Sequence, residues 1–273
     1  MLIDAIKILI TSPADFLSIV NRAFKSKFFK AFYQLDVKSQ TGHLCNICGH
    51  KFKIFMSDKW HKNIICPNCY SDIRHRLFFQ VITQKGLINY KDKNGFILHF
   101  APEKILYKFL RENVLSGKYF TADLMVHSDL KVDICNMKEI KSSKVSCLIA
   151  IDVLEHVVSL EQALKETWRV LKNDGIAIFS FPTIDGVLKT IDNNERQLTK
   201  RERLIKFGQI DHNRLIGEDI IYKFKSLNFI ADVYDCSHFD EKIQKLYILK
   251  PNKPSLKKFA TNNRKIYILK KII

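Results

Sequence analysis

The most regular hydrophobic pattern of the chain lies in residues 145–181. Residues 145–151 form a continuous apolar run rich in Val and Ile, which predicts a buried strand. Residues 160–171 carry leucines and a tryptophan at helical spacing, with Ser159 at the N-cap position. Residues 176–181 form a second apolar run. This order predicts a βαβ unit with two parallel strands.

Shorter apolar runs predict the remaining strands of the same sheet. Residues 95–100 and 118–122 precede the βαβ unit, and residues 229–234 and 245–249 follow it as closing strands. Strands that alternate with helical segments are typical of an α/β protein with a mostly parallel, Rossmann-like sheet. Gly175 is predicted to end the helix of the βαβ unit in a left-handed turn.

The N-terminal segment, residues 1–37, is predicted to form two helices, the second beginning at Ser12-Pro13. Phenylalanines recur on one side of the second helix, with basic side chains nearby. Such a stripe packs on the protein's own core or lies on an anionic membrane surface. No apolar run reaches the ~18–20 residues of a membrane span. Asp4 and Lys7 interrupt the place of a secretory signal, so the expected location is cytoplasmic.

The chain is strongly basic, with 45 Lys and Arg against 28 Asp and Glu and a net charge of +17. This surplus favours acidic partners such as nucleic acid, anionic lipid or phosphorylated substrates. A well-solvated surface explains it equally, because the lysines are spread along the whole chain. Residues 251–273 contain no acid, and we expect a basic tail there, part of which forms an edge strand or a short helix.

Cysteines give the strongest chemical signal. The chain has seven, and four fall in two Cys-x2-Cys pairs separated by seventeen residues: Cys45, Cys48, Cys66 and Cys69. This spacing predicts a tetrahedral zinc site. Four sulfur ligands leave no open position, so the metal is expected to be structural. It would stabilise a module too small to fold by its core alone.

A basic run, Arg74-His75-Arg76, follows the second cysteine pair directly, and residues 77–88 are predicted to form a linking helix. Guanidinium and imidazole groups bind phosphate or carboxylate ligands. They pair equally well with acidic residues of an adjoining domain. The sequence leaves both interpretations open.

Two motifs of the βαβ unit resemble a known family. Ile-Asp-Val-Leu-Glu-His-Val at 151–157 and Arg-Val-Leu-Lys-Asn-Asp-Gly at 169–175, followed by a strand and Pro182, look like the fourth and fifth strands of a class I S-adenosylmethionine (SAM) dependent methyltransferase of the type 11 kind. The usual family form has Pro-Gly where this chain has Asn173-Asp174. The combination of motifs is specific, whereas Leu-Glu-His alone would mean little.

Three further motifs resemble a bacterial subgroup of this family that carries an N-terminal four-cysteine zinc module. They are Ser-Asp-Ile-Arg-His-Arg at 71–76, Phe-Ala-Pro-Glu at 100–103 and Gln-Ile-Asp-His-Asn-Arg at 209–214. Tyr70 replaces a glycine usual in the subgroup. Class I methyltransferases in general have Gly-x-Gly after the first strand, which lets the backbone approach the cofactor. This chain lacks those glycines, as the subgroup does.

The resemblance implies SAM as cofactor, beside the structural zinc. An acid at the end of the second strand, here Asp123, can accept hydrogen bonds from ribose hydroxyls, and the family places an acid at Asp133 against the adenine. The implied cofactor-binding residues are Phe100, Ala101, Glu103, Asp123, Asp133, Ile134 and Asp152. His212, oriented by Asp211, is the candidate catalytic base. Asp211-His212 could instead cap the helix that follows.

The sequence therefore predicts four parts: an N-terminal helical segment at 1–40, a zinc module with its linking helix at 41–86, a methyltransferase domain at 87–250 and the basic tail at 251–273. We expect methyl transfer to an oxygen or nitrogen of an acidic or saccharide small molecule. An RNA methyltransferase that grips its substrate through the basic surface is the alternative. A zinc-stapled binding protein with a decayed cofactor pocket is the third hypothesis. Peripheral membrane contact through the N-terminal helices is compatible with each.

Overall fold

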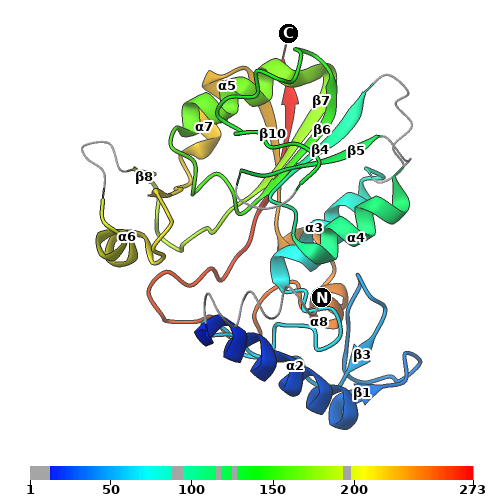
Figure 1. Ribbon diagram of the computed structural model, residues 1–273. Coiled ribbons are helices and arrows are strands. Elements are labelled where there is room, and N and C mark those ends of the chain that lie inside the picture. Colours follow the sequence, from blue (N-terminus) through cyan, green and yellow to red (C-terminus); the bar gives the residue numbers. More distant parts are fainter. Residues whose placement is uncertain (1–12, 88–94, 115–117, 125–127, 193–197, 273) are drawn as a thin grey trace.

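A computed structural model describes residues 13–87, 95–114, 118–124, 128–192 and 198–272, without the side chains of residues 13–19. Its centre is a six-stranded sheet with helices on both faces (Figure 1). The strands, in their order across the sheet, are β10 (Phe229–Tyr234), β11 (Ile266–Lys271), β7 (Leu171–Ser180), β6 (Val145–Ile151), β4 (Phe96–Phe100) and β5 (Tyr119–Ala122). β5, β4, β6 and β7 are parallel, whereas β11 runs antiparallel to both of its neighbours. This is the predicted Rossmann-like, mostly parallel sheet.

The strand order reverses at β4. The chain goes from β4 to β5 on one side, and then returns to β6 and β7 on the other side. In open α/β sheets, ligands bind beyond the carboxyl ends of the strands at such a switch point. The carboxyl ends of β4 and β6 are therefore the expected place for a site.

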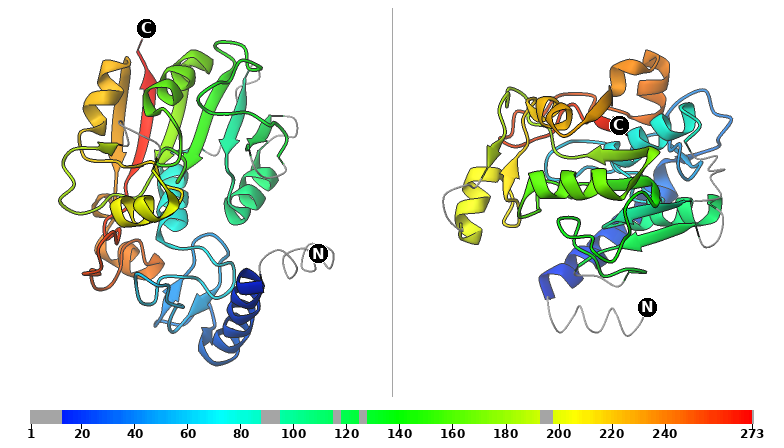
Figure 2. Two further views of the ribbon diagram at one scale, coloured as in Figure 1. Left: turned by 60° about the vertical axis from the view of Figure 1, so that its left-hand side comes forward. Right: turned by 90° about the horizontal axis from the view of Figure 1, so that it is seen from above.

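Two apolar layers pack on the sheet. Helices α5 (Leu160–Val170) and α7 (Ile220–Ser226) cover one face, and α3 (Ile73–Gln84) and α4 (Lys104–Asn113) cover the other. Successive residues of β6 alternate between the two layers, as the pleat of a strand requires. Figure 2 shows the two helix pairs on opposite sides of the sheet. Both faces are thus covered, which explains the nearly continuous apolar run of β6.

The four-cysteine module, residues 34–72, lies beyond the carboxyl end of the sheet (Figure 1). Its small core combines cysteines and aromatic side chains with Ile248, which comes from the far end of the sequence. The short elements of the chain are β1 (Gln34–Leu35), β2 (His43–Leu44), β3 (Lys51–Phe52), β8 (Ile191–Asp192), β9 (Arg214–Leu215), α6 (Lys200–Phe207), α8 (Glu241–Tyr247) and a 3-10 turn (Cys236–His238). The small module therefore depends on a distant segment for part of its core.

The N-terminal helix α2 (Pro13–Tyr33) leaves its apolar stripe open. Phe24, Phe28 and Phe32 are 72%, 45% and 70% exposed. Packing of the stripe on the chain's own core is therefore not seen among the described residues, and membrane contact stays a prediction. The first predicted helix falls on residues outside those described. No helix in the described part of the chain is long and apolar enough to cross a membrane.

The structure confirms most of the predicted elements. The strands expected at 95–100, 118–122, 145–151 and 229–234 are β4, β5, β6 and β10. Ser159 caps α5, since its hydroxyl accepts a hydrogen bond from the Gln162 amide at 3.2 Å. The linking helix also forms, as α3, but it begins before residue 77 because Asp72 and His75 make a capping box at its N-terminus.

The role predicted for Gly175 is wrong. Helix α5 ends at Val170, and Gly175 lies inside β7 without a positive φ. A Cβ atom there would stand 2.9 Å from the carbonyl oxygen of Val145. Glycine is needed because the adjacent strand backbone comes too close, and not because the chain turns left-handed.

The closing strand was placed wrongly in the sequence prediction. Residues 245–249 are not a strand, because Asp240 caps helix α8 over most of them. The closing strand is β11, which lies inside the sheet between β10 and β7. The sheet therefore extends beyond residue 250, and the segment predicted as a basic tail supplies one of its interior strands.

Candidate metal centre and cofactor site

The four predicted zinc ligands meet at one point of the four-cysteine module. The Sγ atoms of Cys45 and Cys69 are 3.5 Å apart, and those of Cys48 and Cys66 are 3.7 Å apart. Four sulfurs at about 2.3 Å from one zinc ion would be separated by about 3.8 Å in a tetrahedron. The hydroxyl of Ser71 lies 3.2 Å from two of these sulfurs, where it can donate to a thiolate. The donor set and its spacing therefore fit zinc.

Arg76 joins this module to the rest of the protein. Its side chain is completely buried and donates hydrogen bonds to four backbone carbonyls. They belong to Ser71 (2.6 Å), Ile64 (2.7 Å), Tyr247 (2.7 Å) and Ile248 (3.1 Å). Two of these carbonyls lie in the module and two at the end of α8. Arg76 is thus a structural clamp, and its guanidinium is not open to an anionic ligand.

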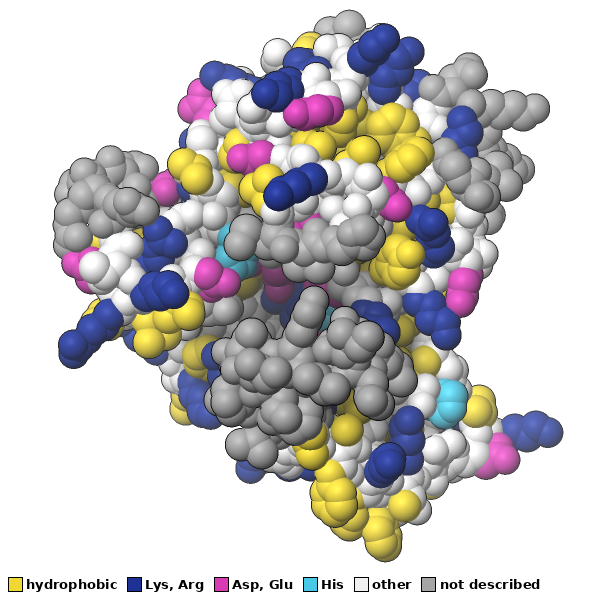
Figure 3. Space-filling view, viewed as in Figure 1, with side chains coloured by type: hydrophobic (Ala, Val, Ile, Leu, Met, Phe, Trp, Pro, Cys, Tyr) yellow, Lys and Arg dark blue, Asp and Glu magenta, His cyan; other side chains and the backbone are white. Residues whose placement is uncertain are grey.

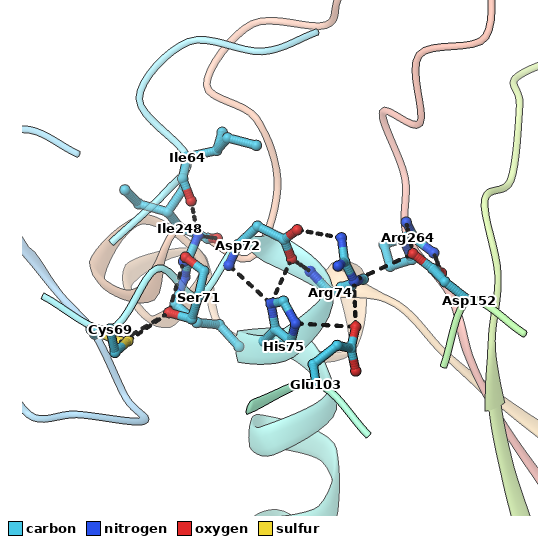
Figure 4. A network of polar contacts seen from close by, with 12 residues as sticks. Ile64, Cys69, Ser71, Asp72, Arg74, His75, Glu103, Asp152, Ile248 and Arg264 are labelled. Atoms are coloured by element: carbon cyan, nitrogen blue, oxygen red, sulfur yellow. Dashed lines mark hydrogen bonds and ion pairs between the residues drawn. The ribbon is translucent and has the colours of Figure 1, made fainter. Parts of the chain in front are cut away.

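Arg74 and His75 form an ion network with Asp72, the N-cap of α3, and with two acids of the sheet domain (Figure 4). Arg74 Nε lies 2.9 Å from Glu103 Oε1 and 3.3 Å from Asp152 Oδ2, while its Nη1 lies 2.5 Å from Asp72 Oδ2. His75 lies 3.0 Å from Asp72 and 3.2 Å from Glu103. Of the two interpretations of the basic run, pairing with an adjoining domain is the one that the structure shows.

The ion network holds its acids ionised. Burial would raise the pKa of Asp72, but the charges of His75 and Arg74 outweigh it and hold the pKa well below its usual range. Burial opposes ionisation of Glu103 too, yet hydrogen bonds and charges from His75 and Arg74 bring its pKa to about 2. The pKa of His75 is raised, because the adjacent carboxylate of Asp72 outweighs the effect of burial. Opposite charges therefore tie α3 to the switch point at neutral pH.

Two backbone turns mark the carboxyl ends of β4 and β6. Ala101 follows β4 with φ of 43°, and Asp152 follows β6 with φ of 53°. Both are left-handed conformations, in which a Cβ atom costs free energy. Ala101 thus takes a conformation that favours glycine, with the smallest side chain that is not glycine. This explains how the sheet turns here without a Gly-x-Gly motif.

A substitution series at Ala101 tests this explanation. We expect Ala101→Gly to change the free energy of unfolding by less than about 1 kcal/mol, since relief of the left-handed turn offsets added freedom of the unfolded chain. Ala101→Val should destabilise by about 1–2 kcal/mol. Ala101 is exposed, so packing does not interfere. Urea denaturation measures both, and Ala31→Val on exposed helix α2 is the control, expected to cost about 0.5 kcal/mol. An Ala101→Val cost no larger than the control would contradict the explanation.

The structure gives the predicted cofactor residues different surroundings. Asp123 follows β5 directly and is half-buried, as is Asp133, which accepts the Cys135 amide at 2.8 Å. Phe100 and Ile134 have side chains in the core, so only their backbone can face a ligand. The carboxylate of Glu103 is occupied by the ion network, and Oε2 alone makes no hydrogen bond. The cofactor roles of these residues stay predictions.

Asp152 is held by two arginines. Arg264, which precedes β11, forms a short ion pair with Asp152 Oδ1 and lies 3.4 Å from Oδ2, and Arg74 approaches from α3. Arg264 was missed by sequence reasoning, because it lies in the segment predicted as a tail. No local signal could place it, since its position depends on β11 entering the sheet.

A cavity of about 140 Å³ opens between the sheet edge, the four-cysteine module and the insertion after β7. Figure 3 shows a hollow between these parts with charged side chains inside it. The polar and aromatic side chains that line the cavity are Asp58, Trp60, His61, Asp72, Arg74, Asp152, Phe207, Gln209, His212, Phe259, Thr261 and Arg264. Asp58, Trp60 and His61 of the module belong to no motif of the sequence analysis, since only the docking of the module brings them to the sheet.

The motif at 211–214 donates hydrogen bonds to the loop that follows β6. Arg214 is almost fully buried and donates to the carbonyls of Leu154 (2.8 Å) and Val157 (2.7 Å), while its Nε lies 3.1 Å from Asp192. Asn213 donates from its backbone amide to the Glu155 carbonyl at 2.8 Å. The motif thus brings residue 212 and the loop after β6 together.

His212 lines the cavity, but Asp211 does not orient it. The Asp211 carboxylate is exposed and lies 3.5 Å from Nδ1 of His156 instead. His212 is 3% exposed, and burial together with the neighbouring His156 lowers its pKa to about 4. Its imidazole is therefore neutral at pH 7. The predicted pairing of Asp211 with His212 is not the contact that the structure contains.

Residues 113–179 match a protein family described as "Methyltransferase domain". The match runs from the end of α4 through β7 and includes Asp123, Asp133 and Asp152. The match covers about a quarter of the chain, so this segment is similar to a methyltransferase domain. A comparison with curated proteins finds no match.

Several solved structures of methyltransferases are similar to this chain. The CurJ carbon methyltransferase is 14% identical with a TM-score of 0.48, over 74% of this chain and 56% of that one. A SAM dependent methyltransferase from Archaeoglobus fulgidus is 11% identical with a TM-score of 0.45, over 71% and 94%. A 1,6-didemethyltoxoflavin-N1-methyltransferase from Burkholderia thailandensis is 11% identical with a TM-score of 0.45, over 74% and 79%. The aligned part spans little more than half the length of the first structure. The fold is established by the strand order.

Proposed function

We propose that this chain, whose residues 113–179 match a methyltransferase domain, transfers a methyl group from SAM to a small polar acceptor. The observation that carries the proposal is the strand topology. It brings Ala101, Asp123 and Asp152, from the ends of three neighbouring parallel strands, to one edge of the sheet at the switch point. A polar cavity opens at the same edge.

The residues at this edge fit SAM. The exposed turn at Ala101 lets the backbone approach the cofactor, with only one methyl group in the way. Asp123 would accept hydrogen bonds from the ribose hydroxyls, and Asp133 would lie against the adenine. SAM supplies a methyl group on a positively charged sulfur, which leaves with the electron pair of the broken C–S bond. The protein's task is then to align the acceptor and to remove its proton.

The cavity supports a small hydroxylated acceptor, such as a saccharide. Carboxylates and guanidinium groups bind hydroxyls, and an indole ring such as that of Trp60 packs on the apolar face of a sugar. His212 faces the same space. RNA remains the alternative acceptor, supported only by the net charge of +17.

Zinc in the four-cysteine module belongs to the same proposal. The module supplies Asp58, Trp60 and His61 to the cavity wall. Its metal would therefore stabilise one side of the acceptor site without taking part in the reaction. In this proposal the metal-stabilised module serves the methyl-transfer reaction by forming one wall of the acceptor site.

Calorimetric titration of the protein with SAM tests the proposal. Binding is expected for the wild type, and Asp123→Ala should weaken it at least about 10-fold, since a ribose ligated by a carboxylate loses two charge-assisted hydrogen bonds of about 1.5–3 kcal/mol each. Asp174→Ala removes an exposed acid 3.9 Å from Lys172 and is the matched control, with unchanged affinity.

Two outcomes would count against the proposal. If folded wild-type protein binds no SAM, then SAM is not its cofactor. If Asp123→Ala and the wild type bind SAM with equal affinity, then Asp123 does not bind the ribose as predicted. If SAM binds as expected, a screen for methyl transfer from labelled SAM to saccharides and to RNA separates the two acceptor classes.

A further inference from the structure

Three side chains beside the cavity form a cluster that the methyl-transfer proposal does not explain. Glu155 and His156 belong to the loop after β6, and His212 belongs to the insertion after β7. Each offers one ligand atom, and these atoms lie within 4.8 Å of one another. The two imidazole rings meet edge to face with centroids 4.8 Å apart, and His156 Nε2 lies 3.9 Å from Glu155 Oε1.

Glu155 has no partner that accounts for its burial. Its side chain is 2% exposed, and neither carboxylate oxygen accepts a hydrogen bond from the described residues. An isolated buried carboxylate costs several kcal/mol unless it binds a proton or a cation. The buried carboxylate of Glu155 therefore needs a bound proton or a bound cation.

Each of the two histidines offers one ring nitrogen to the cluster. His212 is 3% exposed, and neither of its ring nitrogens meets the geometry of a hydrogen bond with a described residue, although the backbone of Phe207 approaches the ring. His156 Nδ1 donates to the Asp211 carbonyl at 3.2 Å, which leaves Nε2 as the acceptor nitrogen that faces Glu155. A backbone carbonyl that fixes the outer nitrogen is the usual support of a metal-bound histidine.

We propose that Glu155, His156 and His212 bind a divalent metal ion, a second site distinct from the four cysteines. Two imidazoles and one carboxylate suit zinc, iron(II) or manganese(II), whereas magnesium and calcium prefer oxygen ligands alone. Ligands on one ion at about 2.1 Å are at most about 4.2 Å apart. The ligand atoms must therefore move together by at least about half an ångström on binding.

Three protein ligands leave coordination positions for other groups, as in catalytic metal sites. Of the three ligands, His212 lines the cavity, so an open position on the His212 side of the ion would face the proposed acceptor. A hydroxyl bound there would lose its proton to solvent more readily, and its oxygen would then attack the methyl carbon as the C–S bond breaks. In this assignment His212 is a ligand and not the base predicted from sequence. This role rests on the proposed function, but metal binding itself does not.

The test uses manganese(II), which prefers nitrogen and oxygen ligands and leaves zinc on the four thiolates. Zinc-loaded full-length protein is titrated with Mn²⁺, without SAM or acceptor, and free ion is measured by electron paramagnetic resonance. We expect one Mn²⁺ per chain. Glu155→Gln and His212→Gln should each weaken binding at least about 10-fold. Glu241→Gln and His238→Gln change exposed residues of the same types and should leave it unchanged.

Pulsed electron paramagnetic resonance on the wild type tests whether histidines bind the Mn²⁺, and this test does not depend on whether the variants fold. Coupling of the bound Mn²⁺ to imidazole nitrogen is expected. Absence of binding up to millimolar Mn²⁺, absence of nitrogen coupling, or equal affinity in the folded ligand variants would each overturn the site and indicate a protonated Glu155. Because SAM is not present, failure here is separate from failure of the proposed methyl transfer.

Discussion

Replacement of Cys66 by serine is expected to unfold the four-cysteine module and to open one wall of the cavity. Cys66 is fully buried in the module core, and its sulfur lies 3.7 Å from that of Cys48. A tetrathiolate zinc site contributes about 10 kcal/mol or more of apparent binding free energy to a small module. The module's own apolar core is small, so it cannot replace that contribution.

Three measurements check this result. Cobalt substituted for zinc should show thiolate charge-transfer absorption in the wild type, and Cys66→Ser should lose it. Limited proteolysis should then cleave within residues 34–72, while chelation of metal from the wild type should produce the same cleavage. Cys135→Ser is the matched control, because its thiol lies outside the cluster and donates to the Ser159 carbonyl at 3.3 Å. A metal-free protein with an intact, protease-resistant module would show that zinc is not what stabilises it.

Replacement of Arg76 by leucine is expected to lower the free energy of unfolding by about 4 kcal/mol. The substitution removes the side-chain donor of four carbonyls. The Ser71 carbonyl still accepts from the Cys66 amide at 2.9 Å, but the carbonyls of Ile64, Tyr247 and Ile248 lose this donor, and each unsatisfied group costs about 1–3 kcal/mol where water cannot enter. Arg76→Lys should cost less, because an ammonium can satisfy some of these carbonyls but lacks the planar fork. The four-cysteine module should also separate from α8, since Arg76 bonds to both.

Urea denaturation measures these losses, and hydrogen exchange at residues 64–71 and 247–248 reports the separation. Arg111→Leu provides the comparison. Its guanidinium is half exposed and lies 3.5 Å from Asp129, so its loss should cost less than about 1 kcal/mol. Similar small losses for Arg76→Leu and Arg111→Leu would mean that the clamp carries no stability.

The errors and omissions of the predictions from sequence have a common origin, because each depends on contacts between distant parts of the chain. Residues 245–249 were predicted as a strand because they are apolar, but Asp240 starts a helix there and Ile248 completes the core of the four-cysteine module. Gly175 was explained by a local turn, whereas the neighbouring strand backbone is what excludes a side chain. The Arg74 and Arg264 ion pairs with Asp152 require α3 and β11 to reach the same sheet edge.

The sequence by itself determined the parts of this protein that depend on local spacing. Hydrophobic periodicity determined β4, β5, β6, β10 and the helix capped by Ser159. The two Cys-x2-Cys pairs determined the cluster of four cysteines. Each of these signals is complete within a short segment. Only the tertiary structure decided that β11 enters the sheet, that the module walls the cavity, and that Glu155 and His212 meet. Those arrangements depend on burial and charge compensation between residues more than 50 positions apart, which no local pattern records.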